Sequence, residues 1–447
     1  MNHDMSSSAS HGAALRGLHR ITCPHCWETF PADRILWITE HADLFGDPML
    51  GPDHPQRFLP TRFNLNGEAI DARGFACHSL ACPKCHLSIP RPLVEMEPLF
   101  LSIFGAPASG KSFFLASMTY QLRQIMSSDF AISFSDADPL LNQQLNEYEE
   151  SLFLNPRAQE MCSLASLIRK TEEQGELYDL VSYGSQTVAY PRPFLFSMQP
   201  QAGHPNSDKA DKLGRVICLY DNAGESFQPG KDVVSSPVTR HMALSRALFF
   251  VFDPTQDVRF LNLMNNGSME NDPSRNDAGL KLSRQEPILQ EAAARIRRYA
   301  KLRQSDKHSR PLFVILTKYD AWSHLLEELV GEENRSEPWK QIGSFKTGER
   351  IHGLDIDRIE RYAKFSRHLM QRACPDIVAA AENFASHVTF LPASAVGWCT
   401  HRGRTDGQLY IRPAEARPFW VTVPFLYALA RCHPGLVPVL KRQGATP

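Results

Sequence analysis

The chain has 447 residues, of which 43% are hydrophobic and 22% are charged; this is the composition of an ordinary globular protein and excludes a disordered or fibrous one. Its length exceeds that of a single typical core, so we expect two or three folded units. With 48 Lys and Arg against 49 Asp and Glu, the net charge is −1, which gives no whole-chain electrostatic reason to bind nucleic acid or an anionic membrane.

The N-terminal residues and the apolar segments carry no sign of membrane targeting. Residues 1–20 are rich in Ser and His and lack an apolar core, which predicts a flexible tail rather than a signal peptide. The longest apolar run, residues 247–252, has the length of a strand, whereas a membrane-spanning helix needs about 20 apolar residues. Ten cysteines are too few for a disulfide scaffold in a chain of this length. We therefore expect a cytoplasmic protein without a membrane span.

Two CPxC pairs stand out in residues 21–98. Cys23 and Cys26 form one pair, and Cys82 and Cys85 form the other. Each pair can present two thiolates from one tight turn, and the four thiolates together would complete a tetrahedral zinc site. This segment is therefore predicted to be a small four-cysteine, zinc-ribbon-like module, whose metal holds together a fold too small for its own core.

Two aspects of this module stay open. Cys77 and His78 lie between the pairs, and either could replace one ligand. Zinc ribbons can bind nucleic acid, but the basic residues of this segment are scattered and balanced by acidic neighbours. Nucleic acid is therefore an allowed but not the favoured partner, and docking to a protein is preferred.

From residue 99 onward, short apolar strands alternate with amphipathic helices, which predicts an α/β domain with a mostly parallel sheet and helices on both faces. A helix is expected at residues 111–126, and an antiparallel edge strand at residues 193–198. The parallel strands are expected at residues 99–104, 215–220, 248–252, 311–316 and 387–391.

The predicted domain, residues 99–436, is longer than such a sheet needs. Residues from about 136 to 185 show apolar residues at helical spacing and predict a helical insertion. The polar, turn-rich residues from about 262 to 282 predict a mobile loop. Residues 437–447 are expected to form a C-terminal tail.

The first motif that carries chemistry joins the strand at 99–104 to the helix at 111–126 and matches the pattern GxxxxGK[ST]. Such a loop turns its amide groups and the helix N-terminus toward phosphates. We expect the lysine of the motif to reach the β and γ phosphates and the serine hydroxyl to bind Mg²⁺. The motif and the residue after it comprise Gly105, Ala106, Pro107, Ala108, Ser109, Gly110, Lys111, Ser112 and Phe113.

A DxxG signature follows the strand at 215–220. Its first and last residues are Asp221 and Gly224, and Glu225 comes next. A carboxylate at this strand end can hold the Mg²⁺ shell, and the glycine amide can bond a γ phosphate and release it after hydrolysis. The signature predicts a nucleotide-sensing switch that begins at Asp221.

Two further motifs indicate which base the bound nucleotide carries. Thr317, Lys318 and Asp320 match [NT]KxD after the strand at 311–316. The carboxylate can accept hydrogen bonds from guanine N1–H and N2–H₂, which adenine does not offer, while the lysine stem packs on the base. Ser394 and Ala395 follow the last strand and match a loop whose backbone contacts the base.

In their order along the chain, these motifs resemble the TRAFAC class of P-loop GTPases, with a Ras-like motif order, over residues from 99 to about 436. Together with the CxxC pairs ahead of the phosphate loop, the chain resembles the bacterial double-GTPase group of conflict systems. The resemblance implies GTP/GDP, Mg²⁺ and Zn²⁺ as cofactors. It implies that Lys111, Asp221 and the residue after the switch glycine serve catalysis, and that Ser112 and Asp221 bind the Mg²⁺.

Two departures from the Ras-like pattern bear on catalysis. Glu225 stands where these enzymes carry a Gln that orients the attacking water, so intrinsic hydrolysis is expected to be slow. The insertion replaces a short switch region, and Thr187 is the candidate for the Mg²⁺-binding switch threonine. Arg240 and Arg246 are expected to be solvated, so an activating partner would supply a catalytic arginine.

The sequence therefore predicts a GTPase that converts GTP to GDP and phosphate slowly and acts as a molecular switch on a protein effector. Three alternatives stay open. The chain could bind nucleotide without turnover, it could be a P-loop ATPase in which Lys318 and Asp320 are merely structural, or it could be a zinc-ribbon nucleic-acid adaptor.

Overall fold

The computed structural model describes residues 18–168, 178–222, 227, 237–264, 284–331, 335–344, 350–402 and 408–440. The predicted tails at 1–20 and 437–447 and the predicted mobile loop at about 262–282 lie largely outside the described residues. Gly224 and Glu225 also lie outside them.

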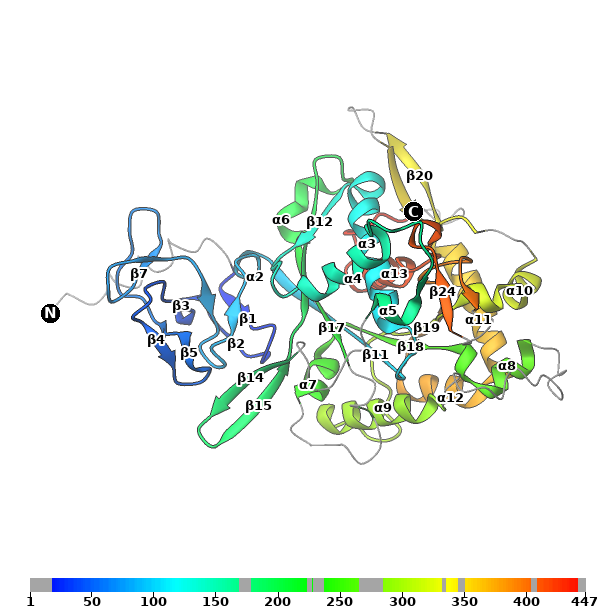
Figure 1. The fold of residues 1–447 in the computed structure, drawn as a ribbon, viewed down its shortest axis with the longest axis horizontal. Helices are drawn as coiled ribbons and strands as arrows, with labels where there is room; N and C mark the ends of the chain where they lie inside the picture. Colours follow the sequence, from blue (N-terminus) through cyan, green and yellow to red (C-terminus); the bar gives the residue numbers. More distant parts are fainter. Residues whose placement is uncertain are drawn as a thin grey trace.

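A seven-stranded, mostly parallel sheet forms the centre of the larger part of the molecule (Figure 1). Its strand order is β12-β16-β17-β11-β18-β19-β22, and the five strands from β17 to β22 are parallel. Every residue of β18 and β19 is buried, as expected for parallel strands that are covered on both faces. The strands are β11 (Glu97–Gly105), β12 (Ile132–Asp136), β16 (Phe194–Pro200), β17 (Arg215–Asp221), β18 (Ala247–Phe252), β19 (Leu312–Leu316) and β22 (Val388–Pro392).

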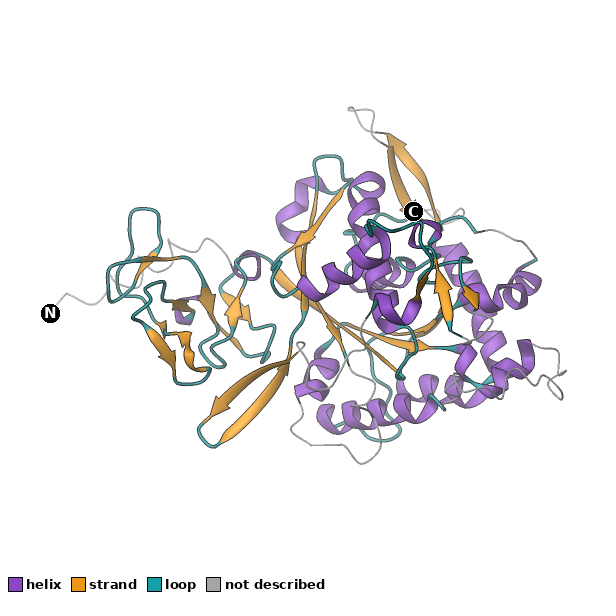
Figure 2. Cartoon of the chain, viewed as in Figure 1, coloured by secondary structure: helices purple, strands orange, loops and turns teal. Residues whose placement is uncertain are grey.

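Helices lie on both faces of this sheet, which confirms the predicted α/β class (Figure 2). Helices α7, α9 and α12 follow one face, and α3, α4 and α13 lie on the other (Figure 1). The helices of the larger part are α3 (Lys111–Phe130), α4 (Gln143–Phe153), α5 (Leu164–Leu167), α6 (Ala210–Leu213), α7 (Pro237–Leu244), α8 (Val258–Met264), α9 (Glu286–Ala300), α10 (Tyr319–Val330), α11 (Ile356–Ala373), α12 (Pro375–Phe384) and α13 (Val423–Cys432).

The edge of the sheet differs from the prediction. The expected antiparallel strand at 193–198 is present as β16, but β12 pairs with its other side, so the edge position predicted for β16 is wrong. Helix α3 ends at Phe130, and Ala131 adopts a left-handed conformation with φ 51° that turns the chain into β12. This five-residue strand lies between two segments of helical apolar spacing, which concealed it in the sequence.

The predicted helical insertion at about 136–185 contains α4 and α5 but is not wholly helical. Strands β14 and β15 form an antiparallel hairpin in which Tyr183 faces Gln186 across a two-residue turn. Gly184 starts this turn with φ 64°, which suits a tight hairpin connection. The remaining strands of the larger part are β13 (Cys162–Ser163), β14 (Tyr178–Tyr183), β15 (Gln186–Pro191), β20 (Trp339–Ser344), β21 (Arg350–Leu354), β23 (His401–Arg402) and β24 (Leu409–Ile411).

A smaller N-terminal part precedes β11 and lies against the β16–β17 side of the sheet (Figure 1). Its apolar core includes residues of the sheet, because Leu195, Val216, Cys218 and Tyr220 belong to the same buried cluster as the module's own residues. Its elements are β1 (Arg20–Thr22), β2 (Thr29–Pro31), β3 (Leu36–Ile38), β4 (Phe45–Asp47), β5 (Gly51–Pro55), β6 (Arg57–Phe58), β7 (Ala69–Ile70), β8 (Ala76–Cys77), β9 (Leu80–Ala81), β10 (Ser88–Ile89) and α2 (Pro92–Glu95).

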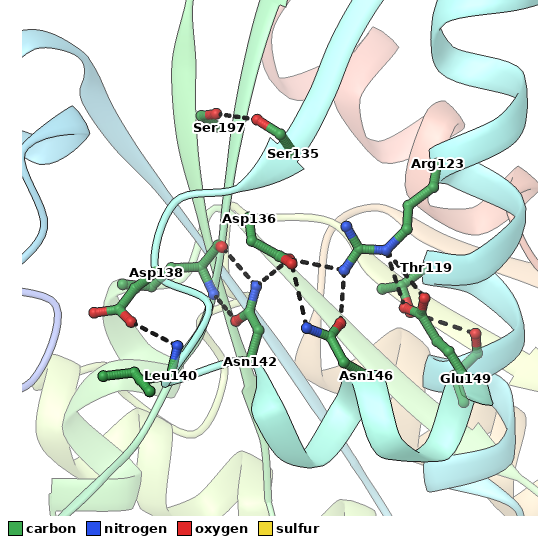
Figure 3. Close-up of polar contacts among 12 residues, drawn as sticks. Thr119, Arg123, Ser135, Asp136, Asp138, Leu140, Asn142, Asn146, Glu149 and Ser197 are labelled. Atoms are coloured by element: carbon green, nitrogen blue, oxygen red, sulfur yellow. Dashed lines mark hydrogen bonds and ion pairs between the residues drawn. The ribbon is translucent and has the colours of Figure 1, made fainter. Parts of the chain in front are cut away.

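A network of side chains fastens α4 to α3 and to the edge of the sheet (Figure 3). Arg123 of α3 donates from Nη2 to Asp136 Oδ1 at 2.7 Å and from Nε to Glu149 Oε2 at 3.0 Å. Asn142 donates to the same Asp136 oxygen at 2.6 Å and exchanges two hydrogen bonds with the backbone of Leu195, at 2.7 and 2.8 Å. A single guanidinium thus neutralises two carboxylates that are mostly out of contact with water.

We predict that Arg123→Met lowers the free energy of unfolding by about 2–3 kcal/mol. The substitution leaves the carboxylates of Asp136 and Glu149 without their cation at positions that are largely buried from water. Arg367→Met is the matched control, since Arg367 pairs with Glu382 on the surface, and should cost less than about 0.5 kcal/mol. Urea unfolding of both variants checks this. Equal losses in the two variants would contradict a special role for the Arg123 network.

Candidate functional site

The GxxxxGK[ST] residues form the loop between β11 and α3. Gly105 ends the strand, and a Cβ placed on it would lie 2.3 Å from the carbonyl oxygen of Val251, so only glycine fits this close approach. Ala108 and Gly110 have φ values of 60° and 90° and turn the chain into the helix. The loop is therefore a tight turn that presents the N-terminus of α3.

Lys111 begins α3 and folds back over this loop. Its side chain is buried, and Nζ donates to the carbonyl oxygens of Gly105 and Ala106, both at 3.1 Å. Ser112 follows it in the first turn of the helix. The ammonium group is thus held at the loop itself, which is where a phosphate group would need a cation.

Side chains from the neighbouring strand ends hold the loop in place. Thr317, after β19, donates from Oγ1 to the carbonyl oxygens of Ser109 at 2.9 Å and Phe252 at 3.1 Å. Gln256, after β18, donates from Nε2 to the carbonyl oxygen of Ala108 at 2.8 Å. The structure therefore brings the TKxD motif and the GxxxxGK[ST] motif into direct contact.

The TKxD and SA motifs also meet. Ser394 donates from Oγ to Asp320 Oδ1 at 2.5 Å and accepts from the amide of Gly397 at 2.9 Å. Burial raises the pKa of Asp320 above its usual value, while the Ser394 hydroxyl opposes this by stabilising the charged form. Ser117 of α3 donates to the carbonyl oxygen of Ala395 at 2.7 Å, so this loop is tied to the same helix that Lys111 begins.

Gln256 and Asp253 belong to this site but were not singled out from the sequence. Lys318 Nζ lies 2.5 Å from Asp253 Oδ2 and 3.3 Å from Thr255 Oγ1. Asp253 is fully buried and follows the all-apolar strand β18. An acidic residue directly after such a strand was the available signal, because polar side chains at carboxyl ends of parallel strands gather at one edge of the sheet.

The DxxG segment is only partly described. Asp221 ends β17 and is buried, whereas Gly224 and Glu225 lie outside the described residues. Thr187 is exposed on β15 opposite Ser182, whose amide donates to the carbonyl oxygen of Met49 in the N-terminal part. The structure therefore places Thr187 on the hairpin and not among the residues that the loops bring together.

The four cysteines of the two CPxC pairs form one group. All are buried, and their sulfur atoms lie within 4.8 Å of one another. The two turns have the same geometry. In the first, the His25 amide donates to Cys23 Sγ at 3.4 Å, and in the second the Lys84 amide donates to Cys82 Sγ at 3.4 Å. Four thiolates gathered this closely are a ligand set that zinc prefers.

The two residues left open as replacement ligands lie elsewhere. Cys77 is buried, and its Sγ donates to the carbonyl oxygen of Phe75. Burial raises the pKa of the Cys77 thiol to about 11. His78 is exposed, and its Nδ1 lies 3.1 Å from Glu68 Oε1. Within the described part of the chain, neither side chain belongs to the four-cysteine group.

We predict that Cys26→Ser abolishes stoichiometric metal binding, because three thiolates no longer close the tetrahedral site. Cys77→Ser, an equally buried thiol in the same module, should keep about one zinc per chain. Elemental analysis of the two variants, purified in parallel with the wild type, is the measurement. Metal loss in Cys77→Ser but not in Cys26→Ser would assign the ligands differently.

Comparison with protein-family models finds no match for the chain. Over 174 residues the chain is 25% identical to a protein of Mycolicibacterium smegmatis described as the putative ESX-1 scaffolding and assembly protein SaeC. The aligned stretch covers 39% of this chain and 37% of that protein, so the chain matches little more than a third of its relative's length. Within the described residues, every helix is too short or too polar to cross a bilayer.

Proposed function

We propose that this protein is a Mg²⁺-dependent GTP-binding protein of the P-loop GTPase class and that it hydrolyses GTP slowly. The observation that carries the proposal is the contact of three motifs far apart in the sequence: Thr317 bonds the phosphate loop at Ser109, and Asp320 bonds Ser394. Chance matches to the three sequence patterns would not require the matching residues to contact one another at the same edge of a parallel sheet.

Each motif has a defined task in this proposal. The N-terminus of α3 and the Lys111 ammonium bind the phosphates, and Ser112 and Asp221 hold the Mg²⁺. Asp320 accepts two hydrogen bonds from guanine, and its link to Ser394 supports it because the hydroxyl stabilises the carboxylate. Lys318, fixed by Asp253, presents its stem to the base.

The same site supports slow turnover. Lys111 stabilises the negative charge on the transferred phosphoryl group, and Asp221 contributes by holding the Mg²⁺ that would neutralise this charge, while Glu225 brings a negative charge where a water-orienting Gln would lie. Faster GTP hydrolysis to GDP and phosphate then requires an activating partner. The four-cysteine group binds Zn²⁺ in this proposal and stabilises the N-terminal part, which is too small to hold a core alone.

The partner is proposed to be a protein. The chain has balanced charge, and the relative in M. smegmatis is described as a scaffolding and assembly protein. A nucleotide-dependent role in assembling a protein complex is therefore the second part of the proposal. Nucleic-acid binding by residues 21–98 is the less favoured alternative.

We predict that Lys111→Ala weakens Mg·GTP binding about 100-fold or more, because a buried cation that bonds the phosphates is lost. Lys364→Ala, which removes an exposed lysine of α11, is the control and should leave the affinity unchanged. Titration with fluorescent GTP, GDP and ATP analogues, with and without Mg²⁺, is the measurement. Absence of nucleotide binding in the wild type, or preference for ATP, would reject the proposal.

We predict that Asp320→Asn weakens GTP binding about 100-fold, because two charge-assisted hydrogen bonds are lost, and leaves ATP binding unchanged. Xanthine carries a carbonyl oxygen in place of the guanine 2-amino group, and the introduced amide can donate to it. The variant should therefore regain affinity for xanthosine triphosphate. Asp211→Asn on the exposed helix α6 is the matched control. An unchanged GTP affinity in Asp320→Asn would favour the ATPase alternative.

Turnover separates a slow enzyme from a binding module. GTP hydrolysis followed over hours with the zinc-loaded protein should show slow release of phosphate that Lys111→Ala removes. Binding without any Lys111-dependent turnover, alone or with candidate protein partners, would support the non-hydrolysing alternative.

A further inference from the structure

Trp27 of the N-terminal part contacts Tyr220, the residue that precedes Asp221. Trp27 directly follows Cys26 in the first cysteine turn and is almost fully buried. Its Nε1 donates to the hydroxyl of Tyr220 at 2.9 Å, across 193 positions of sequence. The indole also lies edge-on to Tyr220 and packs on His241, with ring centroids 6.0 and 5.6 Å away.

Tyr220 links the cysteine turn to the strand end that carries Asp221. It is the last residue before Asp221 on β17, and its hydroxyl donates to the carbonyl oxygen of Pro24, inside the first CPxC pair. Its ring stacks on His241 of α7, with the centroids 4.4 Å apart. The position of the strand end is thus fixed by contacts to both the cysteine turn and α7.

His241 connects Tyr220 to β11, the strand that leads into the GxxxxGK[ST] loop. Asn222 donates from Nδ2 to the carbonyl oxygen of Ile103 at 2.8 Å, so its Oδ1 is left to accept from His241 Nε2, also at 2.8 Å. The other ring nitrogen, Nδ1, then accepts from Ser102 Oγ at 2.9 Å. Burial lowers the pKa of His241 to about 3, so the ring is neutral. The hydrogen bonds then place its one ring proton on Nε2.

Arg240 belongs to the same contact. Its guanidinium lies 5.9 Å from the centre of the Trp27 ring, and the residue is half-buried, in contrast to the solvated position expected from the sequence. Arg246 is exposed, as expected. Helix α7 therefore presents two consecutive residues, Arg240 and His241, to the cysteine turn.

We propose that the cysteine module is a positioning part of the nucleotide site, with Trp27, Tyr220 and His241 as the positioning residues, so that metal occupancy and nucleotide occupancy are energetically coupled. The proposal rests on the proposed GTP binding and adds a regulation of that same site. It follows from the contacts: Tyr220, which precedes Asp221, is bonded by Trp27, and Trp27 directly follows Cys26 of the four-cysteine group.

The local backbone explains why the metal matters for Trp27. The residue has φ 56°, a left-handed conformation that costs a non-glycine residue about 1 kcal/mol. The amide of Trp27 bonds the carbonyl oxygen of Cys23 at 3.1 Å, and the thiols of Cys23 and Cys26 belong to the metal group. Metal loss removes the constraint that holds this conformation, and with it the fixed position of the indole against Tyr220.

The coupling must act in both directions. If metal binding raises the affinity for nucleotide by some factor, nucleotide binding raises the affinity for metal by the same factor. This reciprocity distinguishes coupling from simple damage, because a destabilised module would lower zinc affinity without making it respond to nucleotide.

We predict that Trp27→Phe, with zinc still bound, weakens Mg·GTP binding about 3- to 10-fold, because the bond to Tyr220 and part of the packing on His241 are lost. Trp37→Phe is the matched control: Trp37 is fully buried in the same module and packs on Phe63. It should change nucleotide affinity less than about twofold. Should Trp27→Phe fail to retain zinc, Tyr220→Phe removes the same hydrogen bond from the other side.

The reciprocal measurement uses the full chain. Zinc affinity is measured by competition with a chelator of known affinity, with and without Mg²⁺ and a non-hydrolysable GTP analogue. We expect nucleotide to raise zinc affinity about 5-fold or more in the wild type and in Trp37→Phe, and not in Lys111→Ala.

The outcomes separate the two proposals. The coupling is refuted, while the proposed function stands, if the wild type binds GTP but two further results are found. The zinc affinity of the wild type does not change with nucleotide, and the GTP affinity of Trp27→Phe or Tyr220→Phe equals that of Trp37→Phe. If the wild type binds no guanine nucleotide, the proposed function fails and the coupling fails with it.

Discussion

The close approach of two neighbouring parallel strands determines the candidate site. The end of β11 lies so near β18 that a Cβ on Gly105 would fall 2.3 Å from the carbonyl oxygen of Val251. Because β11, β18, β19 and β22 are parallel and each pairs with the next, their carboxyl ends meet at one edge of the sheet. The loop after Gly105 is thereby brought within hydrogen-bonding distance of Thr317, which follows β19.

The N-terminal part depends on the sheet as well as on its cysteines. Its apolar cluster includes Val216, Cys218 and Tyr220 of β17, so its core is closed by a strand of the other part. A small fold that shares its core in this way is not an independent appendage. The hairpin β14–β15 adds to the shared core through Val181 and Tyr190, which places the insertion beside the module.

The sequence predicted the strand-and-loop units well because each is local: an apolar run followed by a motif at fixed spacing. It missed β12 and the β14–β15 hairpin because short strands beside helical apolar spacing carry little signal of their own. It missed the contact of Trp27 with Tyr220 for a different reason. No local pattern links residues 193 positions apart, and Trp27 alone is consistent with an ordinary core position.

The pairing of Asn222 with His241 joins the end of β17 to α7. These two buried residues are 19 positions apart, and their side chains share a hydrogen bond of 2.8 Å. A buried bond of this kind is costly to leave unmade, so Asn222, directly after β17, and His241 of α7 are held together. His241 also packs on the Trp27 indole, so these contacts connect Asn222 to the first cysteine turn.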